Sequence, residues 1–243
     1  MRLTTVADGE AAARRAADRV TQLLREALDA RGVAHVALAG GSTPKRCHEV
    51  LAGQVDDWSR VHIWLSDERC VAPDDPEANF LMVRESLLDR VSIPDANVHR
   101  VQGELGPEVA ADAYEAELRG HVAEATQAGV PILDIVMAGM GEDGHTLSLF
   151  PGNPAVTVRD RIVVGVHGAP KPPPERVSFT LDLAHAARRC FLLVAGASKA
   201  DALGSVLAGA DPHVPASLLR FGRLEVIADD AAAPARARDV TDS

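Results

Sequence analysis

The sequence has few cysteines, no long apolar run and no excess of positive charge. Its three cysteines, Cys47, Cys70 and Cys190, lie far apart and show no CxxC spacing, which favours reduced thiols over disulfides or a zinc site. No run approaches the roughly 18 apolar residues of a membrane span, and the N-terminal stretch MRLTTVADGEAAARRAADRV lacks the apolar centre of a secretion signal. We therefore expect a cytoplasmic protein that binds no metal.

The charge balance excludes two classes of partner. Asp and Glu number 35 against 25 Lys and Arg, so the formal net charge is −10. Nucleic acids and anionic membranes both require a basic face, and we expect neither as a partner. Any anionic ligand must instead meet a local positive site. A hydrophobic content of 47% is ordinary for a globular protein with a substantial core.

Apolar periodicity predicts helices and strands that alternate along the chain. Helices are expected over residues 9–31, 42–53, 77–91 and 106–125, with shorter ones over 183–189 and 198–209. Strands are expected over residues 33–41, 60–68, 132–140, 160–168, 175–182, 190–196 and 223–229, with a further short strand and loop over 93–104. Such alternation predicts an α/β fold, an open and mostly parallel sheet with helices on both faces. We expect one α/β domain over residues 1–243, with a frayed tail over about residues 231–243.

In an open parallel sheet the ligand binds outside the carboxyl ends of the strands. Five polar loops fall there: AGGSTP, LSDERC, GMGEDGHT, HGAPKPPPER and AGASKA. In the first, Gly40 and Gly41 end a strand, and Ser42 and Thr43 open a helix. Exposed N–H groups and the positive end of the helix dipole would suit a phosphate. A plain capping turn explains the same residues equally well.

Charged side chains in three of the other loops could complete an anion site. Asp67, Glu68 and Arg69 follow a buried strand, where Arg69 could bind an anion and the carboxylates could contact hydroxyls. Solvated loop charge is the alternative. Lys171 and Arg176 flank a stiff run of three prolines that reduces the freedom a binding loop would lose, although a surface spacer would look the same.

Lys199 stands just inside a helix start. The helix dipole disfavours a cation there unless an anion lies nearby, so Lys199 indicates a shared anion site.

The stretch GMGEDGHTLSLFPG fits the G-x-G-x-x-G pattern of a dinucleotide-binding turn through Gly139, Gly141 and Gly144. A dinucleotide fold requires a long helix after the glycines, whereas a Pro-Gly pair soon follows here and allows only a short one. We expect instead a turn that presents uncovered backbone amides together with Asp143 and His145. Histidine is the commonest general base near neutral pH, although a lone histidine is more often structural.

These motifs resemble those of the 6-phosphogluconolactonases. The similarity rests on LAGGSTP, LSDERCVAPDDPEANF, DIVMAGMGEDGHTLSLFPG and APKPPPERVSFTL, which occur in the family's order and span about residues 9–227. It implies the modified Rossmann-like fold shared with glucosamine-6-phosphate deaminases and ribose-5-phosphate isomerases. It also implies hydrolysis of 6-phospho-D-glucono-1,5-lactone in the pentose phosphate pathway, without metal or other cofactor. The sequence departs from the family at Leu147, where many members have alanine and where a larger side chain could narrow the pocket.

The mechanism we expect uses His145 as the base that activates water, with Asp143 orienting the imidazole. Backbone N–H groups of Gly141 to Gly144, or Arg69, would stabilise the oxyanion. The expected phosphate and sugar ligands are Gly40, Gly41, Ser42, Thr43, Asp67, Glu68, Arg69, Gly141, Gly144, Lys171, Arg176 and Lys199.

Two other functions remain open. One is a phosphosugar-binding sensor without turnover. The other is a deaminase-isomerase, against which the Arg69 loop and SLFPG argue, because deaminases usually carry a DEY-type loop and an Asn-Glu-Pro stretch. The expected partner is a small phosphosugar lactone, and the expected state is a monomer or a small homo-oligomer.

Overall fold

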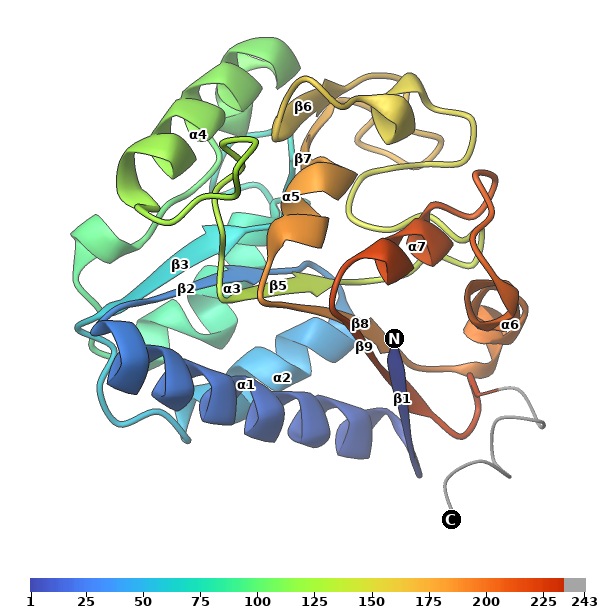
Figure 1. The fold of residues 1–243 in the computed structure, drawn as a ribbon, viewed down its shortest axis with the longest axis horizontal. Helices are drawn as coiled ribbons and strands as arrows, with labels where there is room; N and C mark the ends of the chain where they lie inside the picture. Colours follow the sequence, from blue (N-terminus) through green and yellow to red (C-terminus); the bar gives the residue numbers. More distant parts are fainter. Residues whose placement is uncertain (234–243) are drawn as a thin grey trace.

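A six-stranded sheet runs through the centre of the computed structural model, which describes residues 1–233 (Figure 1). Its order is β1-β9-β8-β5-β2-β3, and each neighbouring pair is parallel. The strands are β1 (Arg2–Val6), β2 (Ala34–Leu38), β3 (Val61–Leu65), β5 (Ile135–Ala138), β8 (Arg189–Val194) and β9 (Leu224–Asp229). The predicted parallel α/β fold is confirmed. The edge strand β1 was not predicted.

A second, three-stranded sheet is antiparallel and has the order β4-β7-β6. Its strands are β4 (Asp67–Arg69), β6 (Val163–Val166) and β7 (Arg176–Phe179). Strands β6 and β7 were expected as strands, but no helix separates them, so they pair antiparallel instead of joining the parallel sheet. This sheet places the proline-rich loop between β6 and β7 beside Arg69 of β4.

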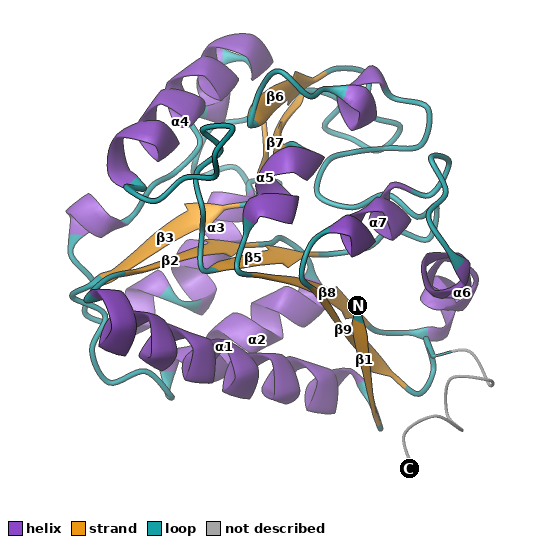
Figure 2. Ribbon diagram, in the orientation of Figure 1, coloured by secondary structure: helices purple, strands orange, loops and turns teal. Residues whose placement is uncertain are grey.

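Helices cover both faces of the parallel sheet (Figures 1 and 2). The helices are α1 (Gly9–Arg31), α2 (Ser42–Ala52), α3 (Asn79–Ser86), α4 (Pro107–His121), α5 (Leu181–Ala186), α6 (Ala200–Ala208) and α7 (Pro215–Leu218). Below the sheet in Figure 1, α1 and α2 lie side by side, and α4 and α5 lie above it. Helix α1 begins where the Asp8 side chain accepts the N–H of Ala11 at 2.8 Å.

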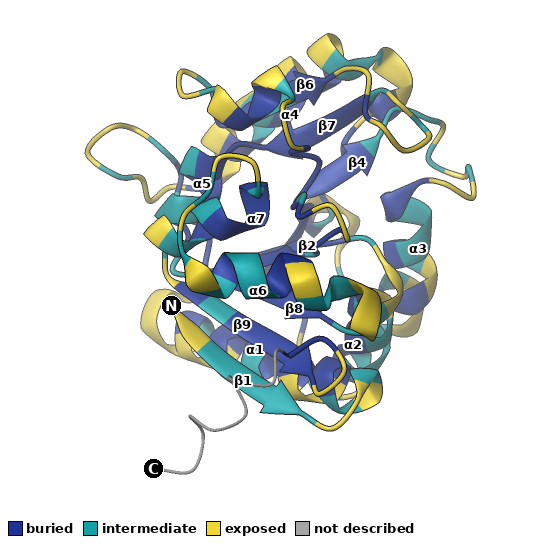
Figure 3. Cartoon of the chain, turned by 90° about the vertical axis from the view of Figure 1, so that its right-hand side faces the viewer, coloured by how far each residue is buried: buried dark blue, intermediate teal, exposed yellow. Residues whose placement is uncertain are grey.

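The core is mainly aliphatic, because the chain has only five Phe, two Trp and one Tyr. Most of these aromatic side chains are fully buried, namely Trp64, Tyr114, Phe150, Phe179 and Phe191. Figure 3 shows the inner parallel strands such as β8 and β9 as buried, the edge strand β1 as partly exposed, and the outer surfaces of the helices as exposed. The Tyr114 hydroxyl accepts the N–H of Leu65 at 2.7 Å and so ties α4 to β3. This contact fixes the position of α4 over the sheet.

Residues 231–233 form a turn after β9, and Ala232 and Ala233 are buried. These residues therefore do not belong to a frayed tail, and the rest of the tail expected over residues 231–243 lies outside the described residues. None of the helices in residues 1–233 is both long and apolar enough to cross a bilayer.

Candidate active site

A cleft of about 350 Å³ opens at the carboxyl ends of the parallel strands, where the sequence predicts the ligand site. Most of the predicted site residues line it. They are Gly40, Gly41, Ser42, Thr43, Asp67, Arg69, Gly141, His145, Lys171, Arg176 and Lys199. Glu68, Asp143 and Gly144 do not line it.

The N-terminus of α2 forms one wall of the cleft. The helical hydrogen bonds begin with the N–H of Lys45, which donates to the carbonyl of Gly41 at 2.9 Å. The N–H groups of Ser42 and Thr43 precede this first bond and are therefore not used inside the helix. Together with their hydroxyls they offer donors to an anion. A Cβ at Gly40 would lie 2.1 Å from Oδ1 of Asn79, so this wall requires glycine there.

Strand β4 directs alternate side chains to opposite sides, as any strand does. Asp67 and Arg69 line the cleft, whereas Glu68 points away from it. The Glu68 carboxylate accepts the backbone N–H groups of Arg69, Asn79 and Phe80 at 2.7, 2.6 and 2.7 Å, and so caps the start of α3. Burial raises the pKa of Glu68 to about 7, against the opposing effect of these three donors. The expectation that Glu68 contacts substrate hydroxyls is therefore not supported by its position.

His145 and Asp143 form a hydrogen-bonded pair at the edge of the cleft. Nδ1 of His145 lies 2.5 Å from Oδ1 of Asp143. This contact assigns the proton to Nδ1 and leaves Nε2 as the basic nitrogen. A Cβ at Gly141 would lie 2.1 Å from Nδ1 of His145 and 2.2 Å from Oδ1 of Asp143, so the pair can form only because residue 141 is glycine.

Burial lowers the pKa of His145, and the Asp143 carboxylate partly opposes this effect. Burial would raise the pKa of Asp143, but the charge and the hydrogen bond of His145 outweigh it, so the pKa falls. Near neutral pH the pair is therefore a neutral imidazole beside an ionised carboxylate. The ring of Phe150 packs 4.5 Å from the imidazole, centroid to centroid.

The turn that carries His145 closes on itself and leads into no helix. The N–H of Gly141 donates to the carbonyl of His145 at 2.9 Å, and that of Gly144 donates to the carbonyl of Gly141 at 3.1 Å. Where a helix was expected to start, Thr146 forms an isolated antiparallel β-bridge with Met140. The short helix expected after His145 is absent. Of the N–H groups of Gly141 to Gly144 that were expected to stabilise an oxyanion, those of Gly141 and Gly144 are already used inside the turn.

The four basic side chains of the cleft make the local positive site that an acidic protein requires. Among the described residues, the buried Nε of Arg69 has no hydrogen-bond partner, although its Nη1 donates to the carbonyl of Glu77. A buried donor without a partner is rare and indicates a group that a ligand can satisfy. Nζ of Lys199 lies 4.0 Å from Oε1 of Glu142.

Arg176 is largely occupied by its own loop. Its Nε donates to the carbonyl of Pro173 and its Nη2 to that of Lys171, each at 3.0 Å. Burial lowers the pKa of its guanidinium, and the nearby Arg69 adds to the effect. Arg176 therefore positions Lys171 at the rim of the cleft.

Two residues that help to shape the cleft, Asn79 and Ser148, were missed in the sequence. Asn79 donates from Nδ2 to the carbonyl of Asp67 at 2.9 Å, and Ser148 donates from Oγ to Oδ2 of Asp67 at 2.7 Å. Leu147, singled out in the sequence as a side chain that could narrow the pocket, does line the cleft, and its φ of 54° is an uncommon backbone conformation for a residue other than glycine. Asn79 and Ser148 both stood inside quoted motifs, but no local pattern indicated that either would contact Asp67.

The parallel sheet and the cation-lined cleft at its carboxyl ends are typical of an α/β protein that binds an anionic ligand. Over residues 7–228 the chain matches the family described as glucosamine-6-phosphate isomerases/6-phosphogluconolactonase. It therefore belongs to this family, and the resemblance to 6-phosphogluconolactonases is confirmed.

Individual relatives agree with this assignment. The chain is 41% identical over 212 residues to the 6-phosphogluconolactonase of Streptomyces coelicolor, covering 84% of this chain and 81% of that protein. The solved 6-phosphogluconolactonase from Trypanosoma cruzi superposes with a TM-score of 0.86 at 26% identity, over 99% of this chain and 97% of that one. A monomeric glucosamine-6-phosphate deaminase superposes with a TM-score of 0.78 at 20% identity, over 96% of this chain and 98% of that one, and shows the shared fold alone.

Proposed function

We propose that this chain is a lactone hydrolase that converts 6-phospho-D-glucono-1,5-lactone to 6-phospho-D-gluconate in the oxidative pentose phosphate pathway. The observation that carries the proposal is that His145, hydrogen-bonded to Asp143, lines the same cleft as a helix N-terminus and four cations. The relatives named 6-phosphogluconolactonase support the same reaction. The substrate supplies both features that the cleft suits, a phosphate and an ester carbonyl.

In the proposed mechanism, Nε2 of His145 accepts a proton from water as the water oxygen attacks the lactone carbonyl. Asp143 accepts the hydrogen bond from Nδ1–H and stabilises the imidazolium that forms. The tetrahedral intermediate then collapses, and the bond from the carbonyl carbon to the ring oxygen breaks. The imidazolium returns its proton to that oxygen, which leaves a hydroxyl and an acid that ionises in solution.

The oxyanion requires a donor other than the Gly141 and Gly144 amides, because both already have partners. Arg69 lines the cleft, and its buried Nε has no partner among the described residues, so it is our candidate. A charged donor stabilises the negative oxygen more strongly in a site with little water.

For the phosphate we propose the N–H groups and hydroxyls of Ser42 and Thr43, with Lys199 and Lys171 as counter-charges. All four residues line the cleft. Each charge-assisted hydrogen bond is worth roughly 1.5–3 kcal/mol, so a few of them account for micromolar to millimolar binding.

The chemistry needs no covalent intermediate. A lactone of this kind also hydrolyses unaided, and general-base catalysis supplies about 10²–10⁴-fold, or roughly 3–5 kcal/mol. We therefore propose hydrolysis without a metal or other cofactor. We further propose that the enzyme acts in the cytoplasm, as a monomer or small homo-oligomer, without a nucleic-acid or membrane partner.

A coupled assay tests the proposal. The lactone is generated in situ from glucose 6-phosphate, and 6-phosphogluconate formation is compared with a blank without the enzyme. We expect the wild-type chain to accelerate formation of the acid and to release no ammonia from glucosamine 6-phosphate. Ammonia release would indicate the deaminase, and binding of 6-phosphogluconate without turnover would indicate a sensor. Either result would overturn the proposal.

A further inference from the structure

A second cluster of chemically active side chains lies at the opposite edge of the parallel sheet from the cleft. His62 stands near the start of β3, whereas the cleft lies beyond the strand ends. His99 lies in the loop between α3 and α4, and its backbone N–H donates to the carbonyl of Ile63 at 2.9 Å. Glu117 and His121 stand on α4, one turn apart, and therefore share a face of the helix.

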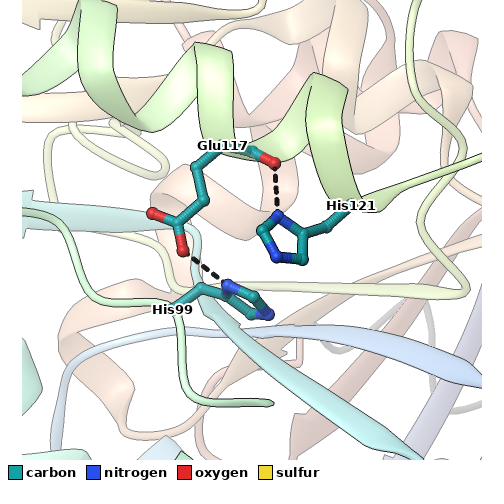
Figure 4. Close-up of side chains that lie close together, drawn as sticks. All are labelled: His99, Glu117 and His121. Carbon is teal, nitrogen blue, oxygen red and sulfur yellow. Dashed lines mark hydrogen bonds and ion pairs between the residues drawn. The ribbon is translucent and has the colours of Figure 1, made fainter. Parts of the chain in front are cut away.

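We propose that His99, Glu117 and His121 bind a divalent transition-metal ion of the Zn²⁺ class. Their ligand atoms all lie within 4.8 Å of one another, the only such group of three among residues 1–233. Figure 4 shows the rings of His99 and His121 and the Glu117 carboxylate turned toward a common point. Two imidazoles and one carboxylate, with a fourth position for water, form a ligand set that zinc readily accepts.

Each histidine already has a partner for the nitrogen that would not bind the ion. Nδ1 of His121 lies 3.0 Å from the backbone carbonyl of Glu117, which leaves Nε2 unprotonated and available. Nε2 of His99 lies 2.8 Å from Nδ1 of His62. When Nδ1 of His99 binds a metal, Nε2–H of His99 can donate a hydrogen bond to Nδ1 of His62. Such outer hydrogen bonds fix the tautomer and orientation of metal-binding histidines.

The ring of His99 is also held in place by packing. It stacks on Trp64 with centroids 3.8 Å apart and planes 7° from parallel. Nδ1 of His99 and Oε1 of Glu117 lie 2.6 Å apart, as a hydrogen-bonded pair. Ligands on a tetrahedral zinc ion at about 2.0–2.1 Å stand roughly 3.3 Å from each other. The ion would therefore replace this hydrogen bond after the half-exposed Glu117 side chain has moved by about 0.7 Å, and ligand atoms that stand as far apart as 4.8 Å would close by about 1.5 Å.

The cluster is open to solvent on one side. His121 is exposed, and it lines a cavity of about 300 Å³ together with His62 and His35. A hydrated ion could reach the site through this cavity. Because the cluster joins α4 to the segment between α3 and α4 that carries His99, and lies away from the cleft, bound metal would stabilise the fold and leave the hydrolysis unchanged.

The test is titration of the full chain, free of affinity tag and stripped with chelator, with Zn²⁺ by calorimetry and with Co²⁺ by visible absorption. We expect one Zn²⁺ per chain, and Co²⁺ bands typical of a four-coordinate site. His121→Ala and Glu117→Gln should each weaken Zn²⁺ binding by about tenfold or more. The matched control His213→Ala removes an exposed histidine elsewhere and should bind as the wild type does.

Both substitutions are at half-exposed or exposed positions, so we expect the variants to fold. Circular dichroism before titration checks this. Absence of stoichiometric Zn²⁺ binding would overturn the proposal, as would equal affinity in His121→Ala and the wild type. His121→Ala should retain full lactone hydrolysis. Failure here and failure of the proposed function would therefore be seen in separate assays.

Discussion

Replacing Gly141 by alanine would place a methyl group on the His145–Asp143 pair. The added Cβ would lie 2.1 Å from Nδ1 of His145 and 2.2 Å from Oδ1 of Asp143, whereas real Cβ contacts are longer than 3.0 Å. The pair must therefore move by about 1 Å. A displacement of that size in a catalytic group costs roughly 10²-fold in rate, or about 2.7 kcal/mol. The backbone at residue 141 has no positive φ, so alanine adds a side-chain clash and no backbone strain.

The measurement is kcat for lactone hydrolysis, corrected for the spontaneous reaction. Gly204→Ala is the matched control, because a Cβ there meets nothing within 4 Å. In a His145→Ala background the Gly141→Ala change should cost little more, since both act through the same imidazole. If Gly141→Ala alone keeps kcat within about threefold of the wild type, the placement of the pair does not control the reaction and the reasoning is refuted.

Three further predictions concern the charges around the cleft. Burial holds the pKa of His145 below its ordinary value of 6.5, so kcat/KM should fall only below that pH, where the base becomes protonated. Asp143→Asn removes a charge that raises this pKa. The pH-rate profile of that variant should therefore show a smaller kcat and an acidic limb moved to lower pH. In Glu68→Gln the amide oxygen can still accept the N–H groups of Arg69 and Asn79, but the amide NH2 faces the N–H of Phe80 and leaves that backbone donor unpaired. This should lower the unfolding free energy by about 1–3 kcal/mol, seen as a lower Tm, with KM unchanged; a raised KM at unchanged Tm would restore Glu68 as a substrate ligand. Lys171→Ala and Lys199→Ala should each raise the Kd for 6-phosphogluconate by roughly ten- to a hundredfold, measured by calorimetry, and unchanged affinity in both would remove them from the phosphate site.

Local pattern was enough to predict the parallel sheet, α1 and the edge at which the cleft opens. Residues 9–31 carry a strong helical period, and α1 spans Gly9–Arg31. Strand β1 was missed because it is a short edge strand with a mostly half-buried pattern, which resembles an irregular terminus. The second sheet pairs β4 with β7, more than 100 residues away, and no local signal predicts such a pairing.

The errors at the site have the same origin. Asp67 and Glu68 fall at the end of the strand expected over residues 60–68 and were grouped with Arg69 as a polar loop, so the alternation of a separate strand was not applied and Glu68 was placed with its neighbours. The amides of the glycine-rich turn were expected to be uncovered, but hydrogen bonds inside the turn use two of them. Contacts that depend on residues distant in sequence, such as Ser148 with Asp67, arise only when the chain folds.

The central claim is that neutral His145 acts as the base in a cleft that binds the phosphate independently. The most direct measurement compares His145→Ala with the wild type in both kcat and affinity for 6-phosphogluconate, with the uncatalysed rate subtracted. We predict that kcat falls by about 10²–10⁴-fold while the Kd for the product changes by less than about threefold. Wild-type turnover in His145→Ala would contradict the account.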